Sequence, residues 1–237
     1  MPAHDRFLRL KQSKDDNTLR YVVTGIITYA LVGYLNEFAA QNQVDREIDR
    51  PPLFDRGHEL MSHVISPIYS NAGLIIFALY FALRWGLPYP ALFAEYIWML
   101  VLLFIVRVVI FSVTQFPPPS PNCSTRKFGD PIHWNVFNKD WKECLDLMYS
   151  GHTFHTVLIC LFVINSKCSV IEKWVVVLLG AFEIYLVIAG RLHYTADVLV
   201  AILVTVLLFY TWPGVRHVLE LRKSPPYITL ATRNRLH

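Results

Sequence analysis

Long apolar runs alternate with polar segments along the 237-residue chain. A helix needs about 20 mostly apolar residues to cross a bilayer. Six segments approach that length, at residues 19–40, 67–87, 91–113, 147–164, 171–190 and 194–212. The second, third and sixth show the pattern most clearly, whereas the fourth is short and the fifth carries Glu183. The pattern predicts an all-α integral membrane protein built as a bundle of six transmembrane helices.

Composition supports the same class. Hydrophobic residues make up 54% of the chain and charged residues only 17%, against about 25% charged in soluble domains. This balance excludes intrinsic disorder, fibrous repeats and most soluble globular classes. Four cysteines are too few for a disulfide scaffold. The net charge of +4 is mild and spread out, so we expect no nucleic-acid partner.

The organisation follows from the ends of the apolar runs. Residues 1–18 form a polar N-terminal segment, 19–213 a membrane domain, and 214–237 a basic tail. The first run is too long and too interrupted for a cleaved signal peptide, so we expect it to remain as an anchor. Lys and Arg are more frequent on the side of the termini, which predicts that both termini are cytosolic. The long polar loops, 41–66 and 114–146, then face the lumen or exterior, where a site is expected.

Two histidine motifs stand at the lumenal ends of the fourth and sixth predicted spans. His152 lies in YSGHT, residues 149–153, and His193 and Asp197 lie in HYTAD, residues 193–197. Residues four apart share one face of a helix, so Asp197 could fix the tautomer of His193 and leave its other nitrogen as a nucleophile. His152 could supply a proton to a leaving oxygen. The alternatives are histidines that only pack at an interface and a metal site, but the chain has neither HExxH nor a Cys pair at metal spacing.

Four motifs in order carry a family resemblance. They are PPLFD at 51–55, the series from Arg107 through VTQFP to NCS at 122–124, CLDLMYSGHT at 144–153, and HYTADVLVA at 193–201. Over residues 20–212 the chain resembles the sphingomyelin synthases and related sphingolipid synthases of the type-2 phosphatidic acid phosphatase superfamily. Three residues depart from the usual motifs, namely Phe54, Phe116 and Leu145, where the family usually has Pro, Leu and Gly. The departures leave the choice of headgroup open.

The resemblance implies a transferase. It would move a phospho-headgroup from a glycerophospholipid to the primary hydroxyl of ceramide and release diacylglycerol. Phosphocholine is the first expectation, with phosphoethanolamine or phosphoinositol as alternatives. His193 would form a phosphohistidine, while His152 would act as acid and then as base. No cofactor or metal is implied. The partners would be membrane lipids, with a possible homo-oligomer, in the Golgi, plasma membrane or endoplasmic reticulum.

Other residues are candidates for binding substrate. Arg107 is a charge inside the third predicted span, which is a functional hypothesis by default; the alternative is a side chain that snorkels to the boundary. Asp55 and Asp146 would hold a choline-like cation with help from aromatic rings. Ser150 and Tyr194, neighbours of the two histidine motifs, complete the substrate-binding set. Glu183 is expected to pair with Arg107 or with another polar group in the bundle.

The cysteines divide between the two sides of the predicted membrane. Cys123 and Cys144 fall in the lumenal loop, where oxidation is permitted, so we expect a disulfide between them. Cys160 and Cys168 should stay reduced. Asn122 begins a glycosylation sequon close to the membrane.

Other functions are open at this stage. A phosphatidylcholine:diacylglycerol cholinephosphotransferase would use the same chemistry with another acceptor. A lipid phosphate phosphatase would use water, but its KxxxxxxRP motif is missing. A CDP-alcohol phosphotransferase would need spaced aspartates that are absent. A channel or transporter would spread polar residues along several spans, whereas here they gather at one end.

Overall fold

The computed structural model describes residues 16–41, 51–61, 63–120 and 147–223, and in these ranges all regular elements are helical. The elements are α2 (Asp16–Gln41), α3 (Arg56–Leu60), α4 (Ile68–Phe81) with its π-helical continuation η2 (Ala82–Gly86), α5 (Pro90–Val113), α6 (Gly151–Ile164), α7 (Val170–Ala189) and α8 (Thr195–Lys223). The predicted all-α class is therefore confirmed for the described residues.

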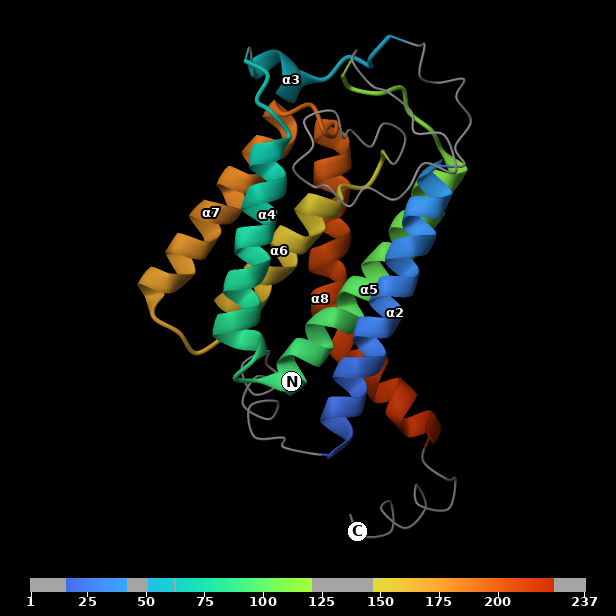
Figure 1. The fold of residues 1–237 in the computed structure, drawn as a ribbon, viewed down its shortest axis with the longest axis vertical. Helices are drawn as coiled ribbons and strands as arrows, with labels where there is room; N and C mark the ends of the chain where they lie inside the picture. Colours follow the sequence, from blue (N-terminus) through green and yellow to red (C-terminus); the bar gives the residue numbers. More distant parts are fainter. Residues whose placement is uncertain (1–15, 42–50, 62, 121–146, 224–237) are drawn as a thin grey trace, which may run out of the picture.

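The long helices form a bundle with the short helix α3 across one end (Figure 1). Helices α4, α6 and α8 begin at this α3 end, and α5 and α7 finish there. Helix α2 packs along α5, while α6 contacts α4, α7 and α8. The first turn of α2 and the last turns of α8 lie at the opposite end. The described residues of the sequence motifs in PPLFD, YSGHT and HYTAD thus converge at the α3 end.

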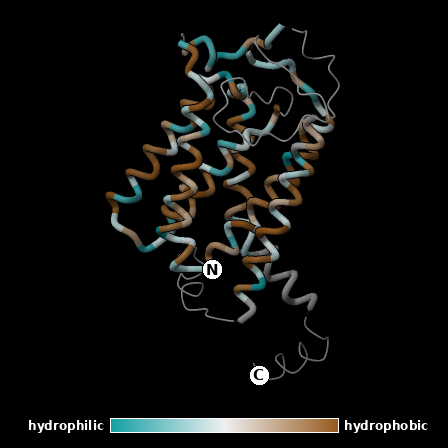
Figure 2. The backbone as a smooth tube through the Cα atoms, in the orientation of Figure 1, coloured by the Kyte–Doolittle hydropathy of each residue, from teal (hydrophilic) through white to brown (hydrophobic). Residues whose placement is uncertain are grey.

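Within the described part of the chain, four helices are long and apolar enough to cross a membrane: Thr18–Ala40, Ile68–Gly86, Pro90–Val113 and Thr195–Pro213. Large apolar side chains are also exposed on the outside of the bundle, and hydrophobic stretches, brown in Figure 2, run along the helices. Such a surface is stable only in a nonpolar environment. The protein is therefore a multi-pass membrane protein, whereas the count of six spans and the cytosolic termini stay predictions.

The two remaining long helices explain the difference between four and six. Helix α6 has 14 residues, which gives about 21 Å at about 1.5 Å per residue, less than the roughly 30 Å of a bilayer core. It begins four residues later than predicted, because the hydroxyl of Ser150 caps it by accepting the Thr153 N–H at 3.3 Å. Helix α7 has 20 residues but contains Glu172, Lys173 and Glu183.

Aromatic packing holds the start of α6 in place. Aromatic rings of α4, α5, α6 and α8 pack together in the main core. The ring centroid of Phe81 lies 4.6 Å from that of Tyr96 and 5.7 Å from that of Phe162, and the centroids of Phe162 and Phe209 are 5.3 Å apart. The first two pairs are tilted and the third is edge-on, and edge-on ring contacts add stability beyond burial alone. Because α6 contributes to this core along its length, the residues at its first turn have a rigid support.

Glu183 has its partner on α4. The hydroxyl of Ser70 donates to Glu183 Oε1 at 2.6 Å, and both side chains are buried. Gly73 lies opposite, and a Cβ there would overlap Glu183 Oε2. The sequence left two partners open for Glu183, Arg107 or another polar group of the bundle. The hydrogen bond from Ser70 supports the second.

Candidate active site at the α3 end

His193 and Asp197 form a buried pair. His193 Nδ1 and Asp197 Oδ2 are 3.3 Å apart, and the two residues are 5% and 1% exposed. An ionised carboxylate can only accept, so the contact is made by the tautomer with its proton on Nδ1. This leaves Nε2 with its lone pair, as a nucleophile requires.

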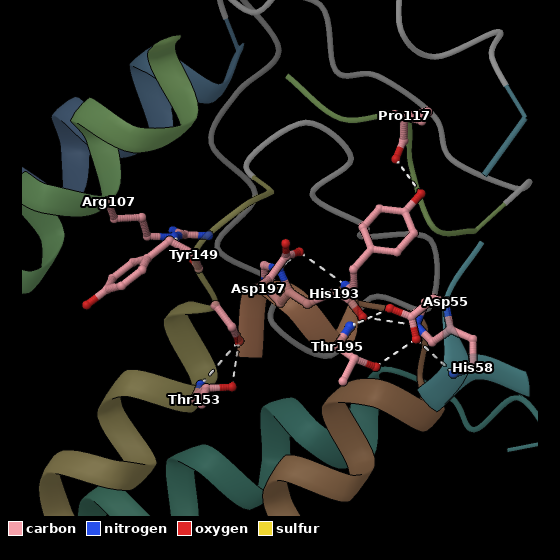
Figure 3. Close-up of polar contacts among 11 residues, drawn as sticks. Asp55, His58, Arg107, Pro117, Tyr149, Thr153, His193, Thr195 and Asp197 are labelled. Carbon is pink, nitrogen blue, oxygen red and sulfur yellow. Dashed lines mark hydrogen bonds and ion pairs between the residues drawn. The ribbon is translucent and has the colours of Figure 1, made fainter. Parts of the chain in front are cut away.

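The pairing arises differently from the one predicted. His193 lies in the loop between α7 and α8, not on a helix, because α8 begins at Thr195. The chain turns so that Asp197, in the first turn of α8, reaches back to the loop, and Asp197 Oδ2 also accepts the Tyr194 N–H at 3.1 Å. An acidic residue at this position satisfies an unpaired amide of the helix start. Asp197 therefore orders the loop and the imidazole together (Figure 3).

The start of α6 adjoins the start of α8. The Ser150 N–H donates to the main-chain oxygen of Asp197 at 3.5 Å. This contact brings the YSGHT motif next to the His193–Asp197 pair. The sequence pattern had predicted that the two histidine motifs lie at the same end of the bundle. Ser150 itself is fully buried and serves as the cap of α6.

His152 is the second residue of α6 and is oriented by α4. Its Nε2 lies 2.8 Å from the amide oxygen of Asn71. Because that oxygen accepts, the neutral ring carries its proton on Nε2 and has its basic nitrogen at Nδ1. Sequence reasoning missed Asn71, although a polar residue within the apolar run 67–87 was a usable signal.

Arg107 is buried rather than snorkelling. It is 4% exposed, its Nε donates to the Tyr149 carbonyl oxygen at 2.9 Å, and its Nη1 donates to Asn36 Oδ1 at 3.1 Å. A Cβ at Gly151 would be 3.5 Å from Arg107 Cζ, so the guanidinium lies against the first residue of α6. Arg107 therefore brings a fixed positive charge to the segment that leads into His152.

Asp55 joins α3 to α8. Its Oδ1 accepts the His58 N–H at 2.9 Å and the Thr195 hydroxyl at 2.7 Å, and its Oδ2 accepts the Thr195 N–H at 2.7 Å. One carboxylate thus caps the first turns of both helices. These contacts give Asp55 a part in shaping the site, and its predicted contact with a cation stays a prediction.

Tyr194 ties two loops together. Its hydroxyl donates to the Pro117 carbonyl oxygen at 2.8 Å and accepts the Leu53 N–H at 3.0 Å. Tyr194 lies just before α8, and burial raises the pKa of its hydroxyl. The phenol therefore keeps its proton and can donate and accept at once. Both connecting segments are held over the site by this single group (Figure 3).

His58 is a site residue to which sequence reasoning gave no role. It is 6% exposed, and its Nε2 lies 3.0 Å from the main-chain oxygen of His193. The available signal was a histidine placed three residues after Asp55 of the PPLFD motif. Four earlier candidates, Asp146, Cys123, Cys144 and Asn122, lie outside the described residues.

Gly57 allows α3 to approach α8. A Cβ at this position would overlap Thr195 Oγ1 and lie 3.2 Å from Asp55 Oδ1. We expect Gly57→Ala to displace the Thr195 hydroxyl from Asp55 and to cost about 1–3 kcal/mol, seen as a lower thermal midpoint in detergent micelles. Gly33→Ala is the matched control, because nothing lies within 4 Å of a Cβ there. Equal midpoints for the two variants would contradict this packing.

Comparison with known proteins agrees with the sequence motifs. Residues 143–213, which include His152, His193 and Asp197, match the family model described as PAP2 superfamily C-terminal. The chain is similar to the phosphatidylinositol:ceramide inositolphosphotransferase of Trypanosoma cruzi, with 33% identity over 137 residues, 54% of this chain and 37% of the relative. It is also similar to the human phosphatidylcholine:ceramide cholinephosphotransferase 1, with 25% identity over 207 residues, 78% of this chain and 48% of the relative.

A third relative carries another headgroup in its name. This is the phosphatidylethanolamine:ceramide ethanolaminephosphotransferase of Trypanosoma brucei brucei, with 35% identity over 121 residues, 46% of this chain and 36% of the relative. The chain thus spans between about a third and half of the length of these relatives. The resemblance to ceramide phosphotransferases is confirmed, at 25–35% identity. The three relatives are named for three different headgroups.

Proposed function

We propose that this chain transfers a phospho-headgroup from a glycerophospholipid to the primary hydroxyl of ceramide, through a phosphohistidine at His193. The observation that carries the proposal is the buried contact of 3.3 Å between His193 and Asp197, within a segment that matches the PAP2 superfamily. The similar ceramide phosphotransferases supply the substrate class.

The first half-reaction forms the covalent intermediate. Nε2 of His193 attacks the phosphorus, a P–N bond forms, and the P–O bond to diacylglycerol breaks. Protonated His152 gives its proton to the departing oxygen, so that diacylglycerol leaves as a neutral alcohol. Asp197 stabilises the ring of His193 as it becomes positive, because the carboxylate is already bonded to Nδ1.

The second half-reaction reverses the proton transfer. His152, now neutral, removes the proton from the primary hydroxyl of ceramide. The hydroxyl oxygen attacks the phosphorus, the P–O bond to ceramide forms, and the P–N bond breaks. Both histidines return to their first protonation states. The 3.5 Å contact between Ser150 and Asp197 supports this division of labour, because it places the start of α6 beside the nucleophile.

Arg107 would supply the positive charge that stabilises the negative phosphate oxygens. Charge that develops in a phosphoryl transition state is stabilised by donors fixed in place beforehand. The contacts of Arg107 with Asn36 and Tyr149 hold its guanidinium against the start of α6. We assign the donor headgroup to phosphocholine, with Asp146 as a further contact to its cation, and we place the site on the lumenal side of a six-span topology.

Reconstitution tests this function. Purified protein in liposomes would receive ceramide with phosphatidylcholine, phosphatidylethanolamine or phosphatidylinositol in turn, and mass spectrometry would identify the products. The expected result is phosphorylcholine-ceramide and equimolar diacylglycerol from the first donor. Transfer from another donor would correct the headgroup alone. Transfer only to added diacylglycerol, or release of free phosphate from a lipid phosphate, would overturn the ceramide assignment.

A further inference from the structure

The main chain at His193, in the loop before α8, is held by a residue of α3. We propose that His58 is a positioning residue for phosphoryl transfer, because it fixes the peptide unit that follows the nucleophilic histidine. This inference rests on the proposed function and adds to it a residue that carries no part of the chemistry itself. His58 contacts the main-chain carbonyl group of His193 and, among the described residues, its side chain makes no hydrogen bond to the reacting ring.

The peptide unit between His193 and Tyr194 is bonded at both of its polar groups. Its carbonyl oxygen accepts from His58 Nε2 at 3.0 Å, and its N–H donates to Asp197 Oδ2 at 3.1 Å. A peptide unit is planar, so two bonds on opposite sides fix its orientation. That orientation fixes the position of the His193 Cα atom and, together with the Nδ1 contact to Asp197, restrains the direction in which the imidazole leaves the chain.

The side-chain pair alone is a weak restraint on the imidazole. The distance of 3.3 Å between His193 Nδ1 and Asp197 Oδ2 exceeds the roughly 2.7–2.9 Å of a strong charge-assisted bond. A second restraint on the backbone therefore has a physical purpose. Attack on phosphorus needs the reacting atoms about 3–3.5 Å apart and aligned, and a misplacement of about 1 Å can cost roughly 10²-fold in rate.

His58 is itself held by contacts at its main-chain N–H, its main-chain carbonyl oxygen and its ring. Its N–H donates to Asp55 Oδ1 at 2.9 Å, its carbonyl oxygen accepts from Arg191 Nη2 at 2.8 Å, and its ring lies 5.6 Å from that of Tyr194. The same Asp55 carboxylate binds Thr195 in the first turn of α8. His58 Nε2 is thus held in place relative to His193, whose carbonyl oxygen it binds, and, through Asp55, relative to Thr195 (Figure 3).

Arg191 shows that this connection outweighs local strain. Its φ of 54° lies in the left-handed region, which an ordinary L-residue adopts only at an energetic cost. In this conformation its guanidinium donates to the carbonyl oxygens of His58 and Met61, at 2.8 and 3.4 Å. Charge-assisted hydrogen bonds to carbonyl groups offset that cost.

Two substitutions distinguish the role of the hydrogen-bond donor of His58 from the role of its aromatic ring. His58→Phe keeps an aromatic ring beside Tyr194 but removes the donor, whereas His58→Gln retains a donor on a side chain of similar reach. We expect His58→Phe to lower kcat about 10- to 100-fold with KM within about twofold, and His58→Gln to recover most of the loss. Arg56→Ala is the control on the same helix, because its side chain is 82% exposed and its ion pair with Glu59 lies at the surface.

A measurement without substrate tests the geometry directly. Diethyl pyrocarbonate modifies accessible imidazoles, and peptide mass spectrometry would give its rate at His193 in each variant. We expect faster modification in His58→Phe than in the wild type, Arg56→Ala or His58→Gln. Unchanged modification and unchanged kcat in His58→Phe would overturn the positioning role. Parallel losses of kcat, KM and thermal midpoint without recovery in His58→Gln would reduce His58 to a folding residue and also overturn it.

The two failures are distinguishable. A wild-type protein that transfers no headgroup in liposomes overturns the proposed function, whatever the variants do. A wild-type protein that transfers headgroups, together with His58→Phe that does so equally well, overturns the positioning role alone.

Discussion

We expect His193→Ala to abolish both the release of diacylglycerol and the formation of the ceramide product. The variant lacks the only atom that we assign to attack on phosphorus, so neither half-reaction can begin. Wild-type protein given donor lipid labelled at phosphorus, without ceramide, should retain label on His193, and the P–N bond should make that label sensitive to acid. Peptide mass spectrometry would locate the modified residue, and the alanine variant should carry no label.

His63→Ala is the matched control for this prediction. His63 is an exposed histidine in the connection between α3 and α4, and its removal should leave both labelling and transfer unchanged. Near-normal transfer by His193→Ala would contradict the covalent mechanism. Label on another residue of the wild type would reassign the nucleophile while leaving the overall transfer intact.

Asp197→Asn has the second largest expected effect, a loss of about 10³–10⁴ in rate by comparison with the hydrolytic triads. The amide keeps the size of the carboxylate but loses its charge, and its nitrogen can donate to Nδ1 of His193. The opposite tautomer is then favoured, with the proton on the nitrogen that should attack. Single-turnover formation of the phosphohistidine, measured by rapid quench, should slow by the same factor as steady-state transfer.

The same substitution weakens the start of α8. Asp197 Oδ2 contacts His193 Nδ1 and also accepts the Tyr194 N–H at 3.1 Å, so an amide nitrogen in its place no longer accepts the Tyr194 N–H and one cap is lost. We therefore expect a thermal midpoint below that of the wild type, with the fold retained. A rate loss below tenfold in the folded variant would show that the charge of Asp197 contributes little to catalysis.

The helices of this bundle are predictable from the chain alone because apolar length is a local property. Every one of the six predicted segments coincides with a helix or with most of one. The predicted helix start was least accurate at the fourth segment, because residues 147–150 were counted as part of the apolar span. Ser150 caps the helix there with its hydroxyl, so α6 begins at Gly151. A cap depends on backbone geometry that hydropathy does not reflect.

The closeness of His193 and Asp197 was also predictable, although for a reason that the structure changes. A spacing of four residues suggested one helical face. In the structure only Asp197 is helical, and the histidine approaches it from the preceding loop. Short spacing brings two side chains together in either case, which is why the prediction of the pair was sound while its geometry was not.

The chain by itself determined the helices and the membrane environment, and it predicted the three residues of the proposed chemistry, because each depends on composition or on spacing within a short segment. Only the tertiary structure showed that Asn71 orients His152 and that His58 holds the carbonyl group of His193. Those contacts join residues 81 and 135 positions apart. No local pattern encodes such a distance, since it depends on how α3, α4, α6 and α8 pack against one another at one end of the bundle.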